Sequence, residues 1–310
     1  MRNSDPTADD SPRTAACAAR RRSIAAAEAP LVVRRARPWR PTPLLRAAAA
    51  WHLGVAGWAL AGRLDARRLR RAVGLVASSH AVLFAASVQP RAGWVGAATV
   101  RLSPASAARG EVALTFDDGP DPEVTPRVLD LLDAADARAS FFCIGRHVRA
   151  HPELAREIVR RGHRLENHTH SHRATFAFLA GAAVDFEIGA AQRAITHAVG
   201  RPPAWFRPPA GMRNPLLHRH IARHGLCYAA WSRRGFDAVS SDPRAVLRRL
   251  TRHLAAGDIL LLHDGSATPR RLRPGRVAVV LDVLPRLLAL FERRGLRAVA
   301  LPDPPPERPG

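Results

Sequence analysis

The segment Thr115-Phe-Asp-Asp-Gly-Pro120 follows the apolar residues Val112-Ala-Leu114 and places two adjacent carboxylates, Asp117 and Asp118, at the expected end of a strand. Carboxylates in such a position point in different directions, so one can bind a cation while the other faces a substrate. A turn that merely ends the strand is the alternative interpretation, because Asp, Gly and Pro are typical turn residues. The segment alone leaves both interpretations open.

From residue 111 onward, short β-rich runs alternate with segments of helical period. The expected strands are 112–116, 139–144, 163–167, 204–207, 226–231, 258–263 and 296–301. The expected helices are 125–135, 152–161, 186–199, 215–224, 243–255 and 279–293, and glycines stand where C-caps are expected, at Gly162, Gly200, Gly225, Gly257 and Gly295. Alternation of this kind predicts an α/β fold of parallel βα units, either an open sheet or a barrel.

The segment Asn167-His-Thr-His-Ser-His172 follows the third expected strand. His168 and His172 are four residues apart and share one face if the chain turns helically, and neutral imidazole suits Zn²⁺ and other first-row divalent ions. His170 would point away from that face. A histidine-rich surface loop without a metal is the alternative.

Two more polar groups follow expected strands. Arg207-Pro-Pro-Ala-Gly211 offers an arginine that can hold a carboxylate and a stiff backbone that can aim an N–H at an oxyanion. Leu260-Leu-Leu-His-Asp264 is an apolar strand that ends in a histidine, His263. An incidental arginine and a structural histidine are the alternatives. All four groups, however, fall at the C-terminal ends of parallel strands, where α/β barrels assemble their active sites.

Together these segments resemble the polysaccharide deacetylases of the NodB-homology family, carbohydrate esterase family 4, over residues 111–301. Thr-Phe-Asp-Asp-Gly-Pro is the most specific of five ordered motifs. The resemblance implies a distorted (β/α)7 barrel, in agreement with the seven expected strands. It also implies a metal-dependent hydrolase that removes N-acetyl groups from amino sugars of a polysaccharide or oligosaccharide.

The resemblance also implies a role for each site residue. The ligands of a divalent ion, Zn²⁺ first among the candidates, are Asp118, His168 and His172. The catalytic groups are the base Asp117, which Arg207 holds, and the general acid His263, which Asp237 holds. The groups expected at the substrate and oxyanion are Ala210 and Leu261.

Two departures from the family bear on substrate fit. The family commonly has Tyr where Ala210 stands, although a backbone N–H is the group it uses there. The family's Asp-Trp pair appears here as Asp237-Ala238, so an apolar wall of the acyl pocket is missing.

The remaining segments are an arm, a hairpin, a linker and a tail. Residues 1–42 are expected to form a disordered basic arm, 91–110 a linker and 302–310 a Pro-rich tail. Residues 43–90 contain two apolar runs, 47–62 and 72–88, which predict a helical hairpin associated with a bacterial inner membrane. Both runs fall short of the roughly 20 residues that span a bilayer, and helices packed on the enzyme are the alternative. Arginines on both sides of the first run leave the topology open.

The net charge of +22 comes entirely from arginine, because the chain has no lysine. With aromatic residues at 5%, we expect no nucleic-acid partner. The family resemblance implies an N-acetylated glycan as substrate. Three alternatives stay open: a deacetylase or deformylase of a lipid-linked sugar, a non-catalytic glycan-binding or export component, and a basic membrane-surface or nucleic-acid binder.

Overall fold

A computed structural model describes residues 34–62, 65–266 and 278–304. Most of the predicted arm 1–42 and of the tail 302–310 lies outside the described residues. Within the described part, every expected strand and helix of the region 111–301 is present, but several are shorter, since the expected strand 226–231 covers only Cys227–Tyr228 and the expected helix 243–255 ends at Thr251.

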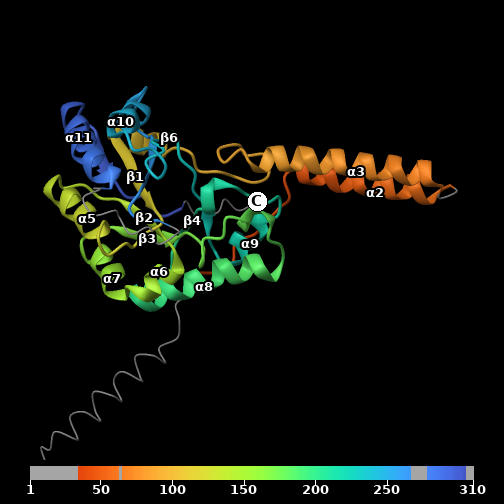
Figure 1. Ribbon diagram of the computed structural model, residues 1–310, viewed down its shortest axis with the longest axis horizontal. Coiled ribbons are helices and arrows are strands. Elements are labelled where there is room, and N and C mark those ends of the chain that lie inside the picture. The colour runs from red at the N-terminus through yellow and green to blue at the C-terminus, as the bar shows by residue number, and fades with distance from the viewer. Residues whose placement is uncertain (1–33, 63–64, 267–277, 305–310) are drawn as a thin grey trace, which may run out of the picture. The chain divides into compact units, whose positions relative to one another are not determined.

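The centre of the fold is a curled parallel sheet, consistent with a distorted (β/α)7 barrel (Figure 1). Its order is β5-β4-β3-β2-β1-β7-β6, and β8 pairs with the beginning of β1. The strands are β1 Glu111–Asp117, β2 Ser140–Cys143, β3 Arg164–Asn167, β4 Trp205–Phe206, β5 Cys227–Tyr228, β6 Arg233–Arg234, β7 Ile259–His263 and β8 Arg297–Val299. Strand β6 was not expected, because two adjacent arginines carry no strand pattern.

Helices surround the curled sheet (Figure 1). They are α5 Thr125–Ala134, α6 Gly145–Ala150, α7 Pro152–Arg160, α8 Ala182–Val199, α9 Leu217–Arg223, α10 Pro243–Thr251 and α11 Val279–Arg293. Helix α6 was not expected, and α8 begins four residues before the expected 186. All five glycines expected as C-caps have a positive φ, which glycine adopts without steric cost.

The predicted linker 91–110 takes part in the barrel. It contains the short helix α4 Pro104–Ala108, and Leu102 lies in the buried core. Thr99 forms a parallel bridge to Ala229, and Arg101 forms an antiparallel bridge to Asp258. Residues 99–102 therefore connect the end of β5 with the start of β7.

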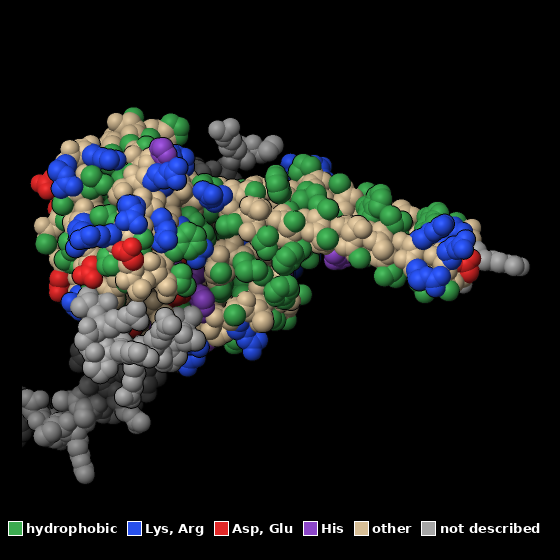
Figure 2. All heavy atoms as spheres, turned by 45° about the horizontal axis from the view of Figure 1, so that its top comes forward, with side chains coloured by type: hydrophobic (Ala, Val, Ile, Leu, Met, Phe, Trp, Pro, Cys, Tyr) green, Lys and Arg blue, Asp and Glu red, His purple; other side chains and the backbone are tan. Residues whose placement is uncertain are grey.

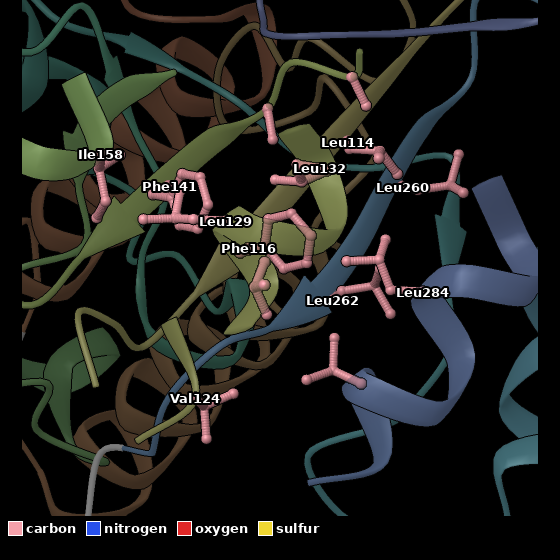
Figure 3. Close-up of a cluster of buried hydrophobic side chains, with 14 of the residues drawn as sticks. Leu114, Phe116, Val124, Leu129, Leu132, Phe141, Ile158, Leu260, Leu262 and Leu284 are labelled. Carbon is pink, nitrogen blue, oxygen red and sulfur yellow. The ribbon is translucent and has the colours of Figure 1, made fainter. Parts of the chain in front are cut away.

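Strand β1 is buried along its whole length, and its two faces have different surroundings. Leu114 and Phe116 pack against α5 and α11, among Leu129, Leu132 and Leu284 (Figure 3). The alternate residue Ala113 belongs to an interior cluster with Phe142, Trp205, Trp231 and Leu261. Because strand side chains alternate, Asp117 continues the interior row and emerges at the top of the barrel.

The predicted hairpin is formed by α2 Pro43–Leu60 and α3 Ala66–Ser87. The Trp51 indole donates to the carbonyl of Leu75 at 3.2 Å, and the rings of His52 and His80 stack at 5.0 Å. Among the described residues, α3 is the one helix long and apolar enough to cross a membrane, and 17% of its apolar window is buried. Most of its other residues are exposed.

Candidate active site

The register of the sheet brings the four predicted polar groups together. Asp117 at the end of β1 lies opposite His263 at the end of β7. Asn167 at the end of β3 lies opposite Phe206 at the end of β4. His168 and Arg207, the residues directly after these two, therefore lie side by side. The C-terminal edge of the sheet therefore collects all four segments, as the barrel expectation required.

Asp118, His168 and His172 form a candidate metal centre, with one ligand atom from each within 4.8 Å of the others. Asp118 Oδ1 lies 3.4 Å from His168 Nε2 and 3.2 Å from His172 Nε2. The backbone of Asp118 is left-handed, with φ 77°. Both carboxylates approach His168 Nε2, Asp117 through Oδ2 at 3.8 Å, but their other partners differ, since Asp117 Oδ1 contacts Arg207 and Asp118 Oδ1 contacts His172.

The helical turn expected after β3 is absent, because residues 168–172 form a loop in which Thr169 and His172 are left-handed. The loop still brings the two imidazoles within 4.9 Å between ring centroids. His170 points elsewhere, as expected, and its ring lies edge-on to Phe186.

The polar atoms of this centre fit a divalent cation. The Nδ1–H of His168 donates to the carbonyl of Arg207 at 2.7 Å, which leaves Nε2 as a free donor atom in the neutral ring. Asp118 Oδ1 is buried and has no hydrogen-bond partner among the described residues. A buried carboxylate oxygen without a donor is costly, and a cation would satisfy it.

The ionisable groups of the centre shift one another's pKa values. Burial alone would raise the pKa of Asp118, but His168, His172 and His263 outweigh it and lower that pKa to about 2. Burial and then the neighbouring His168 lower the pKa of His172 to about 4, so His172 is neutral above that pH. Burial opposes protonation of His168 too, but Asp117 and Asp118 outweigh it and raise its pKa. A proton therefore competes with a cation for His168.

Asp117 is held by a buried arginine. Arg207 is fully buried, and its Nη1 donates to Asp117 Oδ1 at 2.6 Å and to the Thr115 hydroxyl at 2.9 Å. Its Nε and Nη2 donate to the carbonyls of Ala229 and Ala230. Because every arm of the guanidinium is anchored, Arg207 fixes the position of the Asp117 carboxylate.

His263 is held by Asp237, as expected. The Nδ1–H of His263 donates to Asp237 Oδ1 at 3.0 Å, and the backbone N–H of His263 donates to Asp237 Oδ2 at 2.7 Å. Burial by itself would lower the pKa of His263, but Asp237, followed by Asp117 and Asp118, outweighs it and raises the pKa to about 9. The imidazole is therefore protonated near neutral pH.

The two residues expected at the substrate differ in exposure. Ala210 is exposed in the 3-10 turn Pro209–Gly211 and has a left-handed φ of 55°. Leu261 is 1% exposed within the interior cluster. Its neighbour across the sheet is Thr115 of β1.

The comparisons with known proteins agree with this geometry. A family model described as polysaccharide deacetylase matches residues 105–229. A peptidoglycan-N-acetylglucosamine deacetylase of Bacillus cereus is 31% identical, over 62% of this chain and 86% of that protein. A chitooligosaccharide deacetylase of Azorhizobium caulinodans is 32% identical, over 63% of this chain and 94% of that protein. The chain belongs to the polysaccharide deacetylase family.

Solved structures of the family show the same fold. A family 4 carbohydrate esterase of Streptomyces lividans in complex with acetate is 31% identical, with a TM-score of 0.54 over 61% of this chain and 91% of that chain. A carbohydrate esterase family 4 pseudoenzyme of Bacillus anthracis matches with a TM-score of 0.57 at 22% identity, over 66% of this chain and 67% of that chain. The fold alone therefore does not guarantee activity, and the polar groups of the site have to carry that argument.

Two buried acids, Glu187 and Asp264, lie beside segments of the site and were not expected to have a role there. Glu187 on α8 accepts from the backbone N–H groups of His170 and Ser171 through Oε2, at 3.0 and 2.8 Å, and from the Ser171 hydroxyl through Oε1. Asp264 accepts from the Thr125 hydroxyl at 2.6 Å; burial first, then the charges of Asp121 and Asp118, raise its pKa to about 7. Glu187 stands within a helical segment far from any motif, so no local pattern points to it.

Proposed function

We propose that this chain is a metal-dependent hydrolase that removes N-acetyl groups from amino sugars of a polysaccharide or oligosaccharide. The names of its relatives support this class of substrate. The observation that carries the proposal is that three candidate metal ligands and two buried ion pairs lie at one edge of the sheet. The ion pairs are Asp117 with Arg207 and Asp237 with His263.

Asp118, His168 and His172 are the proposed metal ligands. Imidazole nitrogens with a single carboxylate suit Zn²⁺, and other first-row divalent ions suit the same donors. When bound, such an ion polarises the acetyl carbonyl and acidifies a water molecule. Hydrogen bonds of the His168 ring and of the 170–171 backbone hold these ligands in place.

The catalytic roles follow from the two pairs. Asp117, oriented by Arg207, accepts the proton of the attacking water. His263, kept protonated by Asp237, donates a proton to the departing nitrogen, so acetate and a free amine leave. An exposed backbone at Ala210 is suited to offer an N–H to the oxyanion. Leu261 contributes packing beneath these groups.

A membrane location is proposed for the hairpin. α3 is largely unburied and exposes apolar side chains, including Leu69, Val73 and Val82. Burial of such a surface in lipid is favourable, at about 25 cal/mol per Å². We propose that the enzyme is attached to a bacterial inner membrane through this hairpin.

Acetate release from a panel of acetylated glycans tests the function, before and after removal and return of divalent metal. We expect release that a chelator abolishes and added metal restores. The variant Asp117→Asn should lose turnover by roughly 10²- to 10⁴-fold and keep its metal, because the three ligands are untouched. Metal loss in this variant would contradict the division of labour between Asp117 and Asp118. Metal binding without release from any glycan would favour a non-catalytic glycan-binding protein.

A further inference from the structure

A mostly apolar cavity of about 540 Å³ lies between the end of α3 and two loops of the barrel. Its volume falls within the range of ligand pockets, roughly 300 to 1,000 Å³. α3 and its C-cap supply Leu83, Phe84 and Val88, and the barrel supplies residues 177–181 and 212–216. None of these residues has a role in the chemistry described above.

Both barrel segments continue directly from loops of the candidate active site. Residues 177–181 begin five positions after the metal ligand His172, and Met212 follows the turn Pro209–Gly211 that contains Ala210. Arg213 ties the second segment to the end of α3, because its backbone N–H donates to the carbonyl of Ser87 at 3.3 Å. The cavity is therefore built from the site's own loops and from the hairpin.

The rim of the cavity is open and apolar. Phe84, Phe178 and Leu216 are 50%, 68% and 46% exposed, and the rings of the two phenylalanines stack at 6.2 Å. Phe84 belongs to α3, whose unburied apolar surface continues away from the rim. Figure 2 shows hydrophobic side chains along the hairpin, with arginines gathered at its far end. Exposed apolar side chains therefore extend from α3 to the rim of the cavity, and a hydrocarbon chain would be favoured over water along this surface.

One buried cation lines the cavity without an acidic partner. Arg213 is 1% exposed, and it donates to the carbonyls of Gln89, Ala92 and Gly96. Its Nε has no hydrogen-bond partner, and no carboxylate pairs with it in the part of the chain that the structure describes. Burial lowers the pKa of Arg213. A buried charge of this kind favours a ligand that brings a negative group.

We propose that the cavity holds the hydrocarbon chain of a lipid-linked amino sugar, with the linking phosphate near Arg213, and that this sugar lipid is the substrate. The inference rests on the proposed function and narrows its substrate class. The chain positions the sugar at the loops that carry His172 and Ala210. A soluble oligosaccharide occupies the same catalytic groups without this contact, so it should bind less tightly.

The test uses the full chain in detergent with N-acetylglucosaminyl farnesyl diphosphate as the probe and tri-N-acetylchitotriose as the soluble substrate. Ala180→Trp narrows the cavity, and Ala183→Trp, just outside its lining, is the matched control. We expect saturable binding of the probe by the wild type, a Kd at least 10-fold higher in Ala180→Trp, and no change in Ala183→Trp. Acetate release from the soluble substrate should be the same in all three.

A second variant, Phe84→Asp, places a charge at the rim and should raise the Kd of the probe in the same way. The carboxylate would lose its hydration against the hydrocarbon chain, and it would repel the phosphate. Absence of saturable binding by the wild type, or an unchanged Kd in both Ala180→Trp and Phe84→Asp, would overturn the inference. Failure of the proposed function looks different: the probe binds saturably, the variants weaken it, and no acetate leaves either compound.

Discussion

Asp237→Asn is the most direct test of how this site keeps its acid protonated. Burial disfavours the charged imidazole of His263, and Asp237 is the largest of the charges that overcome this effect. The variant keeps the volume of the side chain but removes the charge, so burial is opposed only by the smaller effects of Asp117 and Asp118. We expect the pKa of His263 to fall from about 9 to about its ordinary 6.5.

The sign follows from the direction of the shift. A raised pKa means that the acid is present below that pKa and lost above it, so the alkaline limb of the rate profile should lie at higher pH in the wild type than in the variant. At pH 8 about 90% of His263 is protonated in the wild type and about 3% in the variant, which predicts a roughly 30-fold loss of rate. At pH 6 the loss should be less than about twofold.

The measurement is kcat/KM between pH 5.5 and 10 at saturating metal, for wild type and Asp237→Asn in parallel. A bound divalent cation lowers the pKa of nearby acids in both proteins, so the separation of the two alkaline limbs is the quantity to compare. We expect a separation of about 2.5 pH units, equivalent to roughly 3 kcal/mol. A uniform loss at every pH, with the limb unmoved, would refute the argument and leave Asp237 a purely structural residue.

Variants at three further positions probe the scaffold. Glu187→Ala should weaken metal affinity roughly 10- to 100-fold by freeing the 170–171 backbone, whereas Glu187→Gln, which still offers an acceptor, should bind nearly as well; titration with metal under a competing chelator separates them. Arg207→Met leaves the buried Asp117 carboxylate unpaired and should lower the free energy of unfolding by about 3 to 5 kcal/mol, measured by urea denaturation, where an unchanged midpoint would contradict the pairing. Leu114→Ala should lower the free energy of unfolding by about 2 to 5 kcal/mol in the same assay and leave metal binding unchanged. Loss of metal binding at unchanged stability would contradict the placement of Leu114 in the hydrophobic core.

Much of the fold could be predicted from sequence because the pattern is local. Seven apolar runs alternate with helical segments that end in glycine, and local periodicity is enough to place them. Strand β6 was not predicted, because Arg233 and Arg234 form a strand through their pairing with β7 and have no strand pattern of their own. The role of residues 99–102 in the barrel was not predicted for the same reason, since their β-bridges depend on distant partners.

The candidate site divides in a similar way. Asp117, Asp118, His168, His172, Arg207 and His263 were predicted because their motifs place reactive side chains at strand ends. Glu187 was not, because a glutamate within a helix has no signature that distinguishes a buried support from a solvated residue. The contact that supports the 170–171 backbone joins positions 16 and 17 residues apart.

The adjacent residues Asp117 and Asp118 separate what the sequence predicts from what the tertiary structure decides. The sequence by itself determined that two carboxylates stand at the end of a buried strand, because apolar periodicity and a turn signal are local properties. Only the folded chain decided that Asp118 turns left-handed towards two histidines, while Asp117 meets an arginine 90 residues away. Those directions depend on strand register and on buried hydrogen bonds, which exist only once distant segments have packed together.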